Sequence, residues 1–207
     1  MCTQSILVPS LLTRKIVQQL HFTDEGLLVE RTAGGKHLSV KWLDVVGVRV
    51  KVNVIKGLYF NVGHQYCIHL KCDDHTVHVI EMNSIYGIRR RLYEQLLSDV
   101  FRLMFDFHFT PLLNYYMELH NMGQAFTLDG ITVYEDGVSW DKRPKFPWDE
   151  LEVTTYSRYF VLRNRFGIQY RKFLYFGSDW NACLLLDLLR QLIKAHNGYV
   201  YDSRTEE

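Results

Sequence analysis

Hydrophobic and polar residues alternate in two separate stretches of the chain, and each stretch closes with a helical pattern. In the first stretch, the alternation predicts strands at 15–22, 27–31, 38–41, 45–55, 66–71 and 76–81. In the second stretch, strands are expected at 126–134, 138–140, 151–156, 159–163 and 168–176. Runs of strands followed by a single helix, twice over, predict an α+β, β-rich protein.

Apolar residues at three-to-four spacing predict a helix over Ile85–Phe107, with Ser84 as its cap. A second apolar stripe extends the apolar surface of this helix beyond one face. We therefore expect it to pack on its own sheet and also against the second domain or a second subunit. Thr110-Pro111 predicts the start of a short helix that ends at Gly123, and a last helix is expected over Trp180–His196.

The two halves of the chain repeat the same landmarks. Each contains an acidic turn closed by glycine, Thr23–Gly26 and Tyr134–Gly137. A tryptophan followed by an acid and an aliphatic residue comes next, in Trp42–Val45 and in Trp148–Leu151. A repeat of about 100 residues is too long for a solenoid unit and predicts a duplicated domain. We expect one domain over 1–109, a packed helical connector over 110–123 and a second domain over 124–207.

This order of elements resembles the pleckstrin-homology-like (PH-like) superfold, and the tryptophan element is similar to a region of bacterial PH-like domains. The resemblance covers about residues 13–108 and 124–197. It implies two repeated PH-like units in tandem, each a bent antiparallel sheet closed by a C-terminal α-helix. PH domains that bind phosphoinositides carry Lys and Arg in the first hairpin loop. Here we expect Asp24-Glu25 and Glu135-Asp136 in those loops, which would repel phosphate.

The net charge of +1 gives no overall field that would attract nucleic acid or an anionic membrane. No apolar run approaches the ~20 residues of a spanning helix. No basic region precedes the first apolar residues, and Cys2 stands where myristoylation needs Gly, so neither a secretory signal nor that lipid is expected. The absence of a CxxC pair among Cys2, Cys67, Cys72 and Cys183 predicts free thiols and a cytoplasmic location.

Potential metal ligands are dense between His64 and His78. A two-residue turn at Asp73-Asp74 would place His69 directly opposite His78, with Cys67 diagonal to His78. The core face of this hairpin would then consist of Ile68, Leu70, Val77 and Val79. A structural zinc site takes four ligands. Two readings follow: a metal site built on His69, His78 and Cys67 with a further ligand from elsewhere, or a solvated histidine-rich hairpin.

Basic side chains accompany aromatic ones near an expected hairpin tip at 163–167. The residues concerned are Arg163, Arg165, Arg171 and Lys172. Such a combination can bind phosphate or single-stranded nucleic acid, and it is equally typical of an ordinary solubilising turn. The run Arg89–Arg91 is expected on a solvated helix face, and Trp42 and Trp148 are expected to pack within the fold.

No GxSxG, P-loop, GxGxxG or HExxH motif occurs, so neither an enzyme nor a cofactor is expected. Our first hypothesis is a non-enzymatic binding or scaffold module for a protein partner, with a homodimer as one arrangement, because peptides add to exposed sheet edges in such folds. One alternative is a carrier of a lipid or other apolar small molecule between sheet and helix. Another is a weak anion or nucleic-acid binder that uses the four basic residues above.

Overall fold

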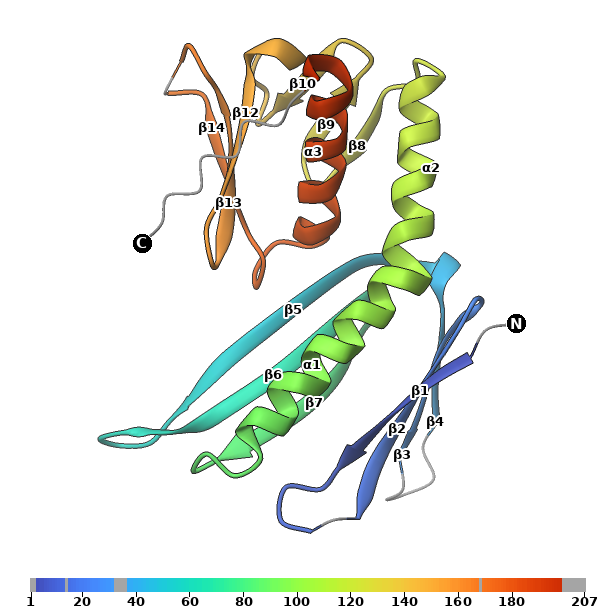
Figure 1. Ribbon diagram of the computed structural model, residues 1–207, viewed down its shortest axis with the longest axis vertical. Coiled ribbons are helices and arrows are strands. Elements are labelled where there is room, and N and C mark those ends of the chain that lie inside the picture. The colour runs from blue at the N-terminus through green and yellow to red at the C-terminus, as the bar shows by residue number, and fades with distance from the viewer. Residues whose placement is uncertain (1–2, 14, 32–36, 168, 199–207) are drawn as a thin grey trace. The chain divides into compact units, whose positions relative to one another are not determined.

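The computed structural model describes residues 3–13, 15–31, 37–167 and 169–198. Its strands form four antiparallel sheets, so the protein is α+β and β-rich, as predicted. The chain divides into two compact units, Met1–Thr110 and Pro111–Glu207. Both units contain a four-stranded sheet, a 3₁₀ turn, a three-stranded sheet and a helix in the same order (Figure 1).

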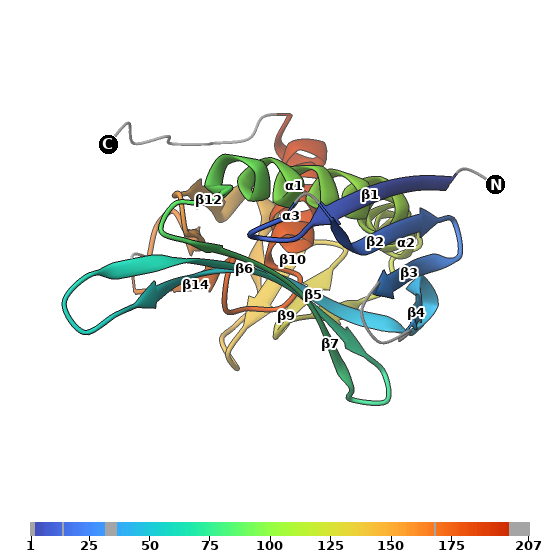
Figure 2. The same cartoon turned by 90° about the horizontal axis from the view of Figure 1, so that it is seen from below.

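The first unit has a sheet of β1 (Thr3–Pro9), β2 (Ile16–Thr23), β3 (Gly26–Arg31) and β4 (His37–Lys41). After the turn η1 (Trp42–Asp44) comes a sheet of β5 (Val45–Lys56), β6 (Asn61–Cys72) and β7 (Val77–Ile85). Helix α1 (Arg90–Met104) contacts β1 of one sheet and β6 and β7 of the other. Val100, Leu103 and Met104 of α1 are buried, so this helix completes the core between the two sheets (Figure 1, Figure 2).

The second unit begins with α2 (Thr110–Asn121), which ends in a turn of two hydrogen bonds: Gly123 N–H to His120 O, and Gln124 N–H to Leu119 O. Gly123 has φ +70°, which glycine adopts without strain. The strands are β8 (Phe126–Leu128), β9 (Ile131–Tyr134), β10 (Gly137–Trp140), β11 (Phe146–Pro147), β12 (Leu151–Thr155), β13 (Tyr159–Asn164) and β14 (Arg171–Tyr175). The 3₁₀ turn η3 (Trp148–Glu150) precedes β12, and α3 (Ala182–Asn197) closes the unit.

A glycine holds the same place in both units for the same steric reason. Gly26 begins β3, and a Cβ added there would lie 2.2 Å from the carbonyl oxygen of Val40. Gly137 begins β10, and a Cβ added there would lie 2.1 Å from the carbonyl oxygen of Phe146. In each case the contacted carbonyl stands two residues before the tryptophan. The glycine of each acidic turn therefore allows the next strand to approach.

The order of the first strands differs from the prediction. Residues 15–22 were predicted as the first strand, but β1 precedes them and pairs with β2. The acidic turn at Thr23–Gly26 therefore joins β2 to β3, and the turn at Tyr134–Gly137 joins β9 to β10. The first loop of the chain is instead the segment 10–15, whose sequence includes Lys15. The prediction that Asp24-Glu25 and Glu135-Asp136 lie in the first hairpin loops was therefore wrong.

The predicted β6–β7 hairpin is present, but its register is shifted by one residue. Leu70 pairs with His78, and His69 pairs with Val79. The connecting turn is longer than two residues: His75 has φ +68°, and the N–H of Cys72 donates to Thr76 O. Neighbouring residues of a strand point to opposite faces, so the predicted core positions on β6 are right and those on β7 are wrong.

The helical boundaries also differ from the prediction. Ser84 belongs to β7, where its Oγ donates to Ile88 O, and α1 begins only at Arg90. The helix does not restart at Thr110, because a π-helical turn, η2 (Phe105–Phe109), leads directly into α2. Thr110 N–H donates to Phe105 O, five residues back. This wider turn accommodates edge-to-face packing of Phe105 and Phe109, whose ring centroids are 5.2 Å apart.

Candidate functional site

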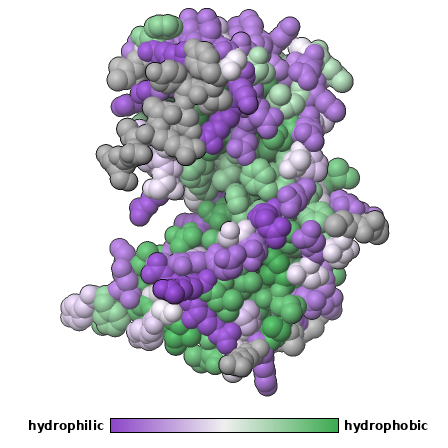
Figure 3. Space-filling model, viewed as in Figure 1, coloured by the Kyte–Doolittle hydropathy of each residue, from purple (hydrophilic) through white to green (hydrophobic). Residues whose placement is uncertain are grey.

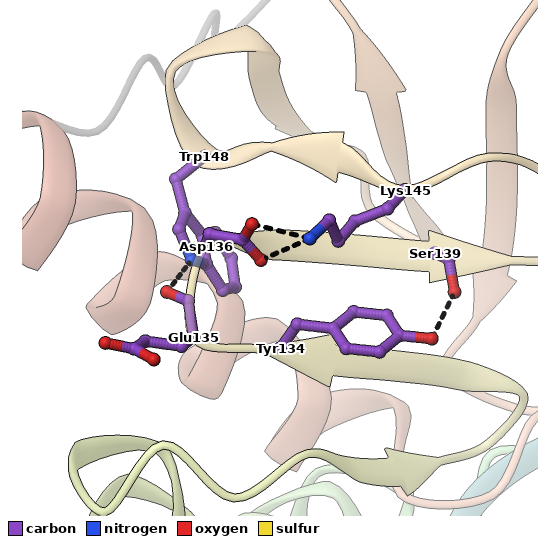
Figure 4. Close-up of polar contacts among 6 residues, drawn as sticks. All are labelled: Tyr134, Glu135, Asp136, Ser139, Lys145 and Trp148. Carbon is purple, nitrogen blue, oxygen red and sulfur yellow. Dashed lines mark hydrogen bonds and ion pairs between the residues drawn. The ribbon is translucent and has the colours of Figure 1, made fainter.

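Each unit fixes its repeated tryptophan through the backbone of its acidic turn. The indole N–H of Trp42 donates to Thr23 O at 2.8 Å. The indole N–H of Trp148 donates to Glu135 O at 3.0 Å (Figure 4). Both side chains are buried. The two tryptophans are therefore packing residues, as predicted, although their partners are main-chain carbonyls and not the neighbouring acids.

In the second unit, the basic loop after β10 forms an ion pair with the acidic turn. Lys145 Nζ lies 2.7 Å from Asp136 Oδ1 and 5.5 Å from the centroid of the Tyr134 ring (Figure 4). The hydrogen bond from Lys145 lowers the pKa of the Asp136 carboxyl. Because this lysine already contacts a carboxylate, its charge contributes little to an anion site.

A histidine ring packs on each repeated tryptophan. His108 stacks on Trp42 with ring centroids 5.2 Å apart, and His196 stacks on Trp148 at 5.3 Å. His120 joins the second pair, with its Nε2 2.9 Å from the Nε2 of His196. Burial lowers the pKa of His108 to about 4. Burial, and secondarily the nearby His196, also lowers the pKa of His120. Both are suited to packing as neutral rings.

The three predicted metal ligands do not come together. His69 pairs with Val79 and His78 pairs with Leu70, so His69 and His78 point to opposite faces of their sheet. Cys67 is buried, on the face that carries His69. No group of three or more His, Cys, Asp or Glu side chains within the described ranges is arranged to hold a metal ion.

Only two of the four predicted basic residues, Arg163 and Arg171, come together. Arg163 makes two hydrogen bonds to the Glu152 carboxylate, at 2.9 and 3.1 Å. Lys172 points to the other face of its strand and forms an ion pair with Asp141 at 2.6 Å. Arg165 lies beyond the end of β13, where its N–H donates to Glu150 O. Arg171 pairs across strands with Arg163 and lies 5.3 Å from the centroid of the Phe173 ring.

Arg171 belongs to an aromatic surface that sequence patterns did not single out. We call it the aromatic face, and it consists of Tyr156, Tyr159, Arg171, Phe173 and Tyr175. The Tyr159 ring lies 4.7 Å from the Tyr156 ring, 5.8 Å from the Phe173 ring and 5.3 Å from the Tyr175 ring, centroid to centroid. Exposed fractions of 38% for Tyr156, 40% for Phe173 and 46% for Tyr175 leave these rings open to a partner.

The aromatic face adjoins a sheet edge. β14 has only β13 as a neighbour in the described sheet. The two residues that flank Arg171–Tyr175 form main-chain hydrogen bonds toward β13. Tyr170 O accepts from Asn164 N–H, and Phe176 N–H donates to Arg158 O. Because alternate residues of an antiparallel strand face the same neighbour, the main-chain groups of Arg171 and Phe173 face the outer edge.

A pocket of about 230 Å³ lies beside this edge, lined in part by Lys172, Leu174, Asp179 and Trp180. Asp179 Oδ2 accepts from the N–H of Tyr175 at 2.7 Å and so occupies the last amide of the strand. The edge, the pocket and the exposed rings thus adjoin one another within the second unit. In the sequence, the alternation of Arg171, Phe173 and Tyr175 was the signal that could have revealed them.

No protein-family model matches the chain, and no curated protein sequence matches it.

Proposed function

We propose that this protein is a non-enzymatic binding module that recognises a protein partner through the aromatic face and the adjoining edge of β14. The observation that carries the proposal is the gathering of Tyr156, Tyr159, Phe173 and Tyr175 beside Arg171 on one exposed surface. Tyrosine and arginine are enriched among the residues that dominate protein–protein binding energy. Rigid aromatic rings supply contact area at low entropic cost.

The mode of binding follows from the edge and the pocket. An extended segment of the partner pairs with the outward main chain of Arg171 and Phe173, as an added strand. One apolar side chain of that segment enters the pocket of about 230 Å³ beside Leu174 and Trp180. An acidic residue of the segment meets Arg171, which, unlike Arg163, makes no ion pair with a carboxylate of the described residues.

The scaffold that carries this surface is, in our proposal, a tandem pair of PH-like units that arose by duplication. The support comes from three features that both units share. They are the order of elements, the buried tryptophan whose indole donates to the acidic turn, and the glycine of that turn, which allows the strand just before the tryptophan to approach. The proposal also places the protein in the cytoplasm, where the described cysteines stay as free thiols. The connector role of 110–123 belongs to the same proposal.

The two alternatives have less support. Anion or nucleic-acid binding would draw on Arg163 and Lys172, which are already paired with Glu152 and Asp141. A carrier would need a cavity under its closing helix. The pocket beside β14 is not lined by α3, and the side chains of α3 that face the core, such as Leu185 and Leu189, are fully buried.

Site-specific photo-crosslinking tests the proposal. A photoreactive phenylalanine analogue is placed at Phe173 and, as a matched control, at Phe166, which is 82% exposed in the same unit. We expect a defined protein adduct from position 173 and not from position 166, identified by mass spectrometry. With that partner, Phe173→Ser should weaken binding by about tenfold or more, with Phe166→Ser unchanged. Adducts to nucleic acid, or the same adducts at both positions, would reject the proposal.

A further inference from the structure

The first unit exposes a cluster of large apolar side chains at one end, on two loops. We call it the apolar tip, and it consists of Leu58, Tyr59, Phe60, Tyr86 and Ile88. Leu58 is 93% exposed and Tyr59 is 95% exposed, which is close to full exposure for both side chains. Single exposed apolar residues are ordinary, but a contiguous group of this kind marks an interaction surface.

The two loops form one ordered structure. The N–H of Gly57 donates to Phe60 O at 2.8 Å and closes the β5–β6 turn. The N–H of Tyr86 donates to Val62 O at 2.7 Å, and the rings of Phe60 and Tyr86 are 6.4 Å apart, centroid to centroid. The β5–β6 hairpin projects from its sheet, with hydrophobic and near-neutral residues at its end (Figure 2, Figure 3). A projecting end makes contact more readily with a flat or deformable surface than with a concave surface.

Basic residues outnumber acidic ones beside the apolar tip. Lys56 precedes the β5–β6 turn, and Arg89, Arg90 and Arg91 directly follow Ile88 in the sequence. Lys56 and Arg91 are exposed beside the tip. Arg89 donates to Thr13 O, and Arg90 forms an ion pair with Glu94 at 2.8 Å. Thus four cations and one acid, the Glu94 that pairs with Arg90, stand beside the apolar tip.

We propose that the apolar tip docks on the surface of an anionic lipid bilayer. Leucine, phenylalanine and tyrosine enter the boundary between headgroups and acyl chains, and lysine and arginine at the rim meet the anionic headgroups. Within the described residues no helix has the length and apolar character that a bilayer crossing requires, so the tip would hold the protein at the surface only. This surface belongs to the first unit, and the proposal is independent of the aromatic face.

Co-sedimentation of the full chain with lipid vesicles is the first experiment. We expect binding to vesicles that contain about 30% phosphatidylserine in phosphatidylcholine, and weak binding to phosphatidylcholine alone. Raising the salt from about 0.1 M to about 0.5 M should weaken the binding, because the exposed cations are then screened.

Paired variants separate the apolar and charged contributions. The triple variant Leu58→Ser, Tyr59→Ser, Phe60→Ser should weaken vesicle binding by about tenfold or more. Its matched control is Leu43→Ser with Phe166→Ser, at positions 95% and 82% exposed, and it should bind as wild type. Lys56→Gln with Arg91→Gln should also weaken binding by about tenfold, whereas Lys41→Gln with Lys142→Gln should not. Circular dichroism checks that each variant is folded.

Three outcomes would overturn the proposal. The first is a wild-type protein that does not bind the anionic vesicles. The second is equal binding to both kinds of vesicle with no effect of the Gln variants. The third is self-association or capture of another protein that the triple variant abolishes while vesicle binding is unchanged, which would make the apolar tip a protein contact.

Discussion

The imidazole of His108 stacks on the indole of Trp42, with ring centroids 5.2 Å apart and planes inclined by 29°. His108 is 3% exposed, and its buried Nε2 has no hydrogen-bond partner among the described residues. A charged imidazolium at this place would be shielded from water. Burial therefore lowers the pKa of His108 to about 4.

This buried histidine makes stability depend on pH. Above about pH 6.5 the ring is neutral in both folded and unfolded chains, so it adds no pH dependence. Between about pH 6.5 and 4 only the unfolded chain takes up the proton, and the folded state loses up to about 3 kcal/mol. We expect His108→Phe, which keeps an aromatic ring on Trp42, to reduce this loss. Urea unfolding at several pH values measures it, and identical pH profiles for the two proteins would contradict the assignment.

Alanine at Gly26 should destabilise the first unit strongly. The new Cβ would lie 2.2 Å from the carbonyl oxygen of Val40, a main-chain atom that cannot move without disturbing β4. We expect a loss of about 3 kcal/mol. Gly87→Ala is the matched control, because its Cβ meets nothing within 4 Å and only the positive φ of 74° opposes it, at about 1 kcal/mol. Thermal unfolding of the two variants gives the comparison, and equal effects would refute the steric explanation.

The pair of Arg163 and Glu152 should contribute measurably to stability. Two hydrogen bonds join them, and the Glu152 side chain is 8% exposed. Arg163→Met should cost about 1–2 kcal/mol, because a mostly buried carboxylate loses its cation. Arg171→Met on the neighbouring strand serves as control and should cost about 0.5 kcal/mol, since within the described part of the chain Arg171 lies over the partly exposed Phe173 ring. In a double-mutant cycle, Glu152→Gln should recover part of the first loss, and additive effects would show no coupling.

The described cysteines should resist alkylation. Burial raises the pKa of Cys183 to about 12, and it also raises the pKa of Cys67 and of Cys72. At neutral pH almost all of the thiol at Cys183 is protonated and unreactive. Iodoacetamide treatment of the native protein followed by peptide mapping should leave these three unmodified until the chain is unfolded in urea. Rapid modification of Cys183 in the native state would be inconsistent with its raised pKa. Cys2 lies outside the described residues.

Element positions were largely predictable from local patterns, because they follow from the periodicity of one chain segment. Most strands after β1 and the final helix fall close to their predicted ranges. The exceptions are 126–134, which was predicted as one strand and forms two, β8 and β9, and β11, which was not predicted. β1 was missed because Thr3–Pro9 has apolar residues in succession and little alternation. The π-helical turn was missed because its cause is the packing of Phe101, Phe105 and Phe109 against one another. The predicted start of the last strand, Ile168, lies outside the described residues, and β14 begins at Arg171.

The candidate sites were less predictable than the fold. Arg163 and Arg171 were chosen by residue type, and the structure shows them paired across strands on one face, while Lys172 points to the other face. His69 and His78 were placed opposite each other because a two-residue turn was assumed. A shift of one residue in register moves a side chain to the other face of the sheet. Because the turn was predicted too short, the predicted metal ligands do not face one another.

The sequence by itself determined that two similar β-rich segments follow one another, each with a glycine-closed turn, a tryptophan and a closing helix. Those features depend on residue types at short spacing, which can be recognised in the sequence directly. Only the tertiary structure decided which side chains share a surface: the rings around Tyr159, and the loops that meet at Phe60 and Tyr86. The reason is physical, since neighbours on a sheet face or between loops are set by strand register and loop closure, and these depend on the packing of distant segments.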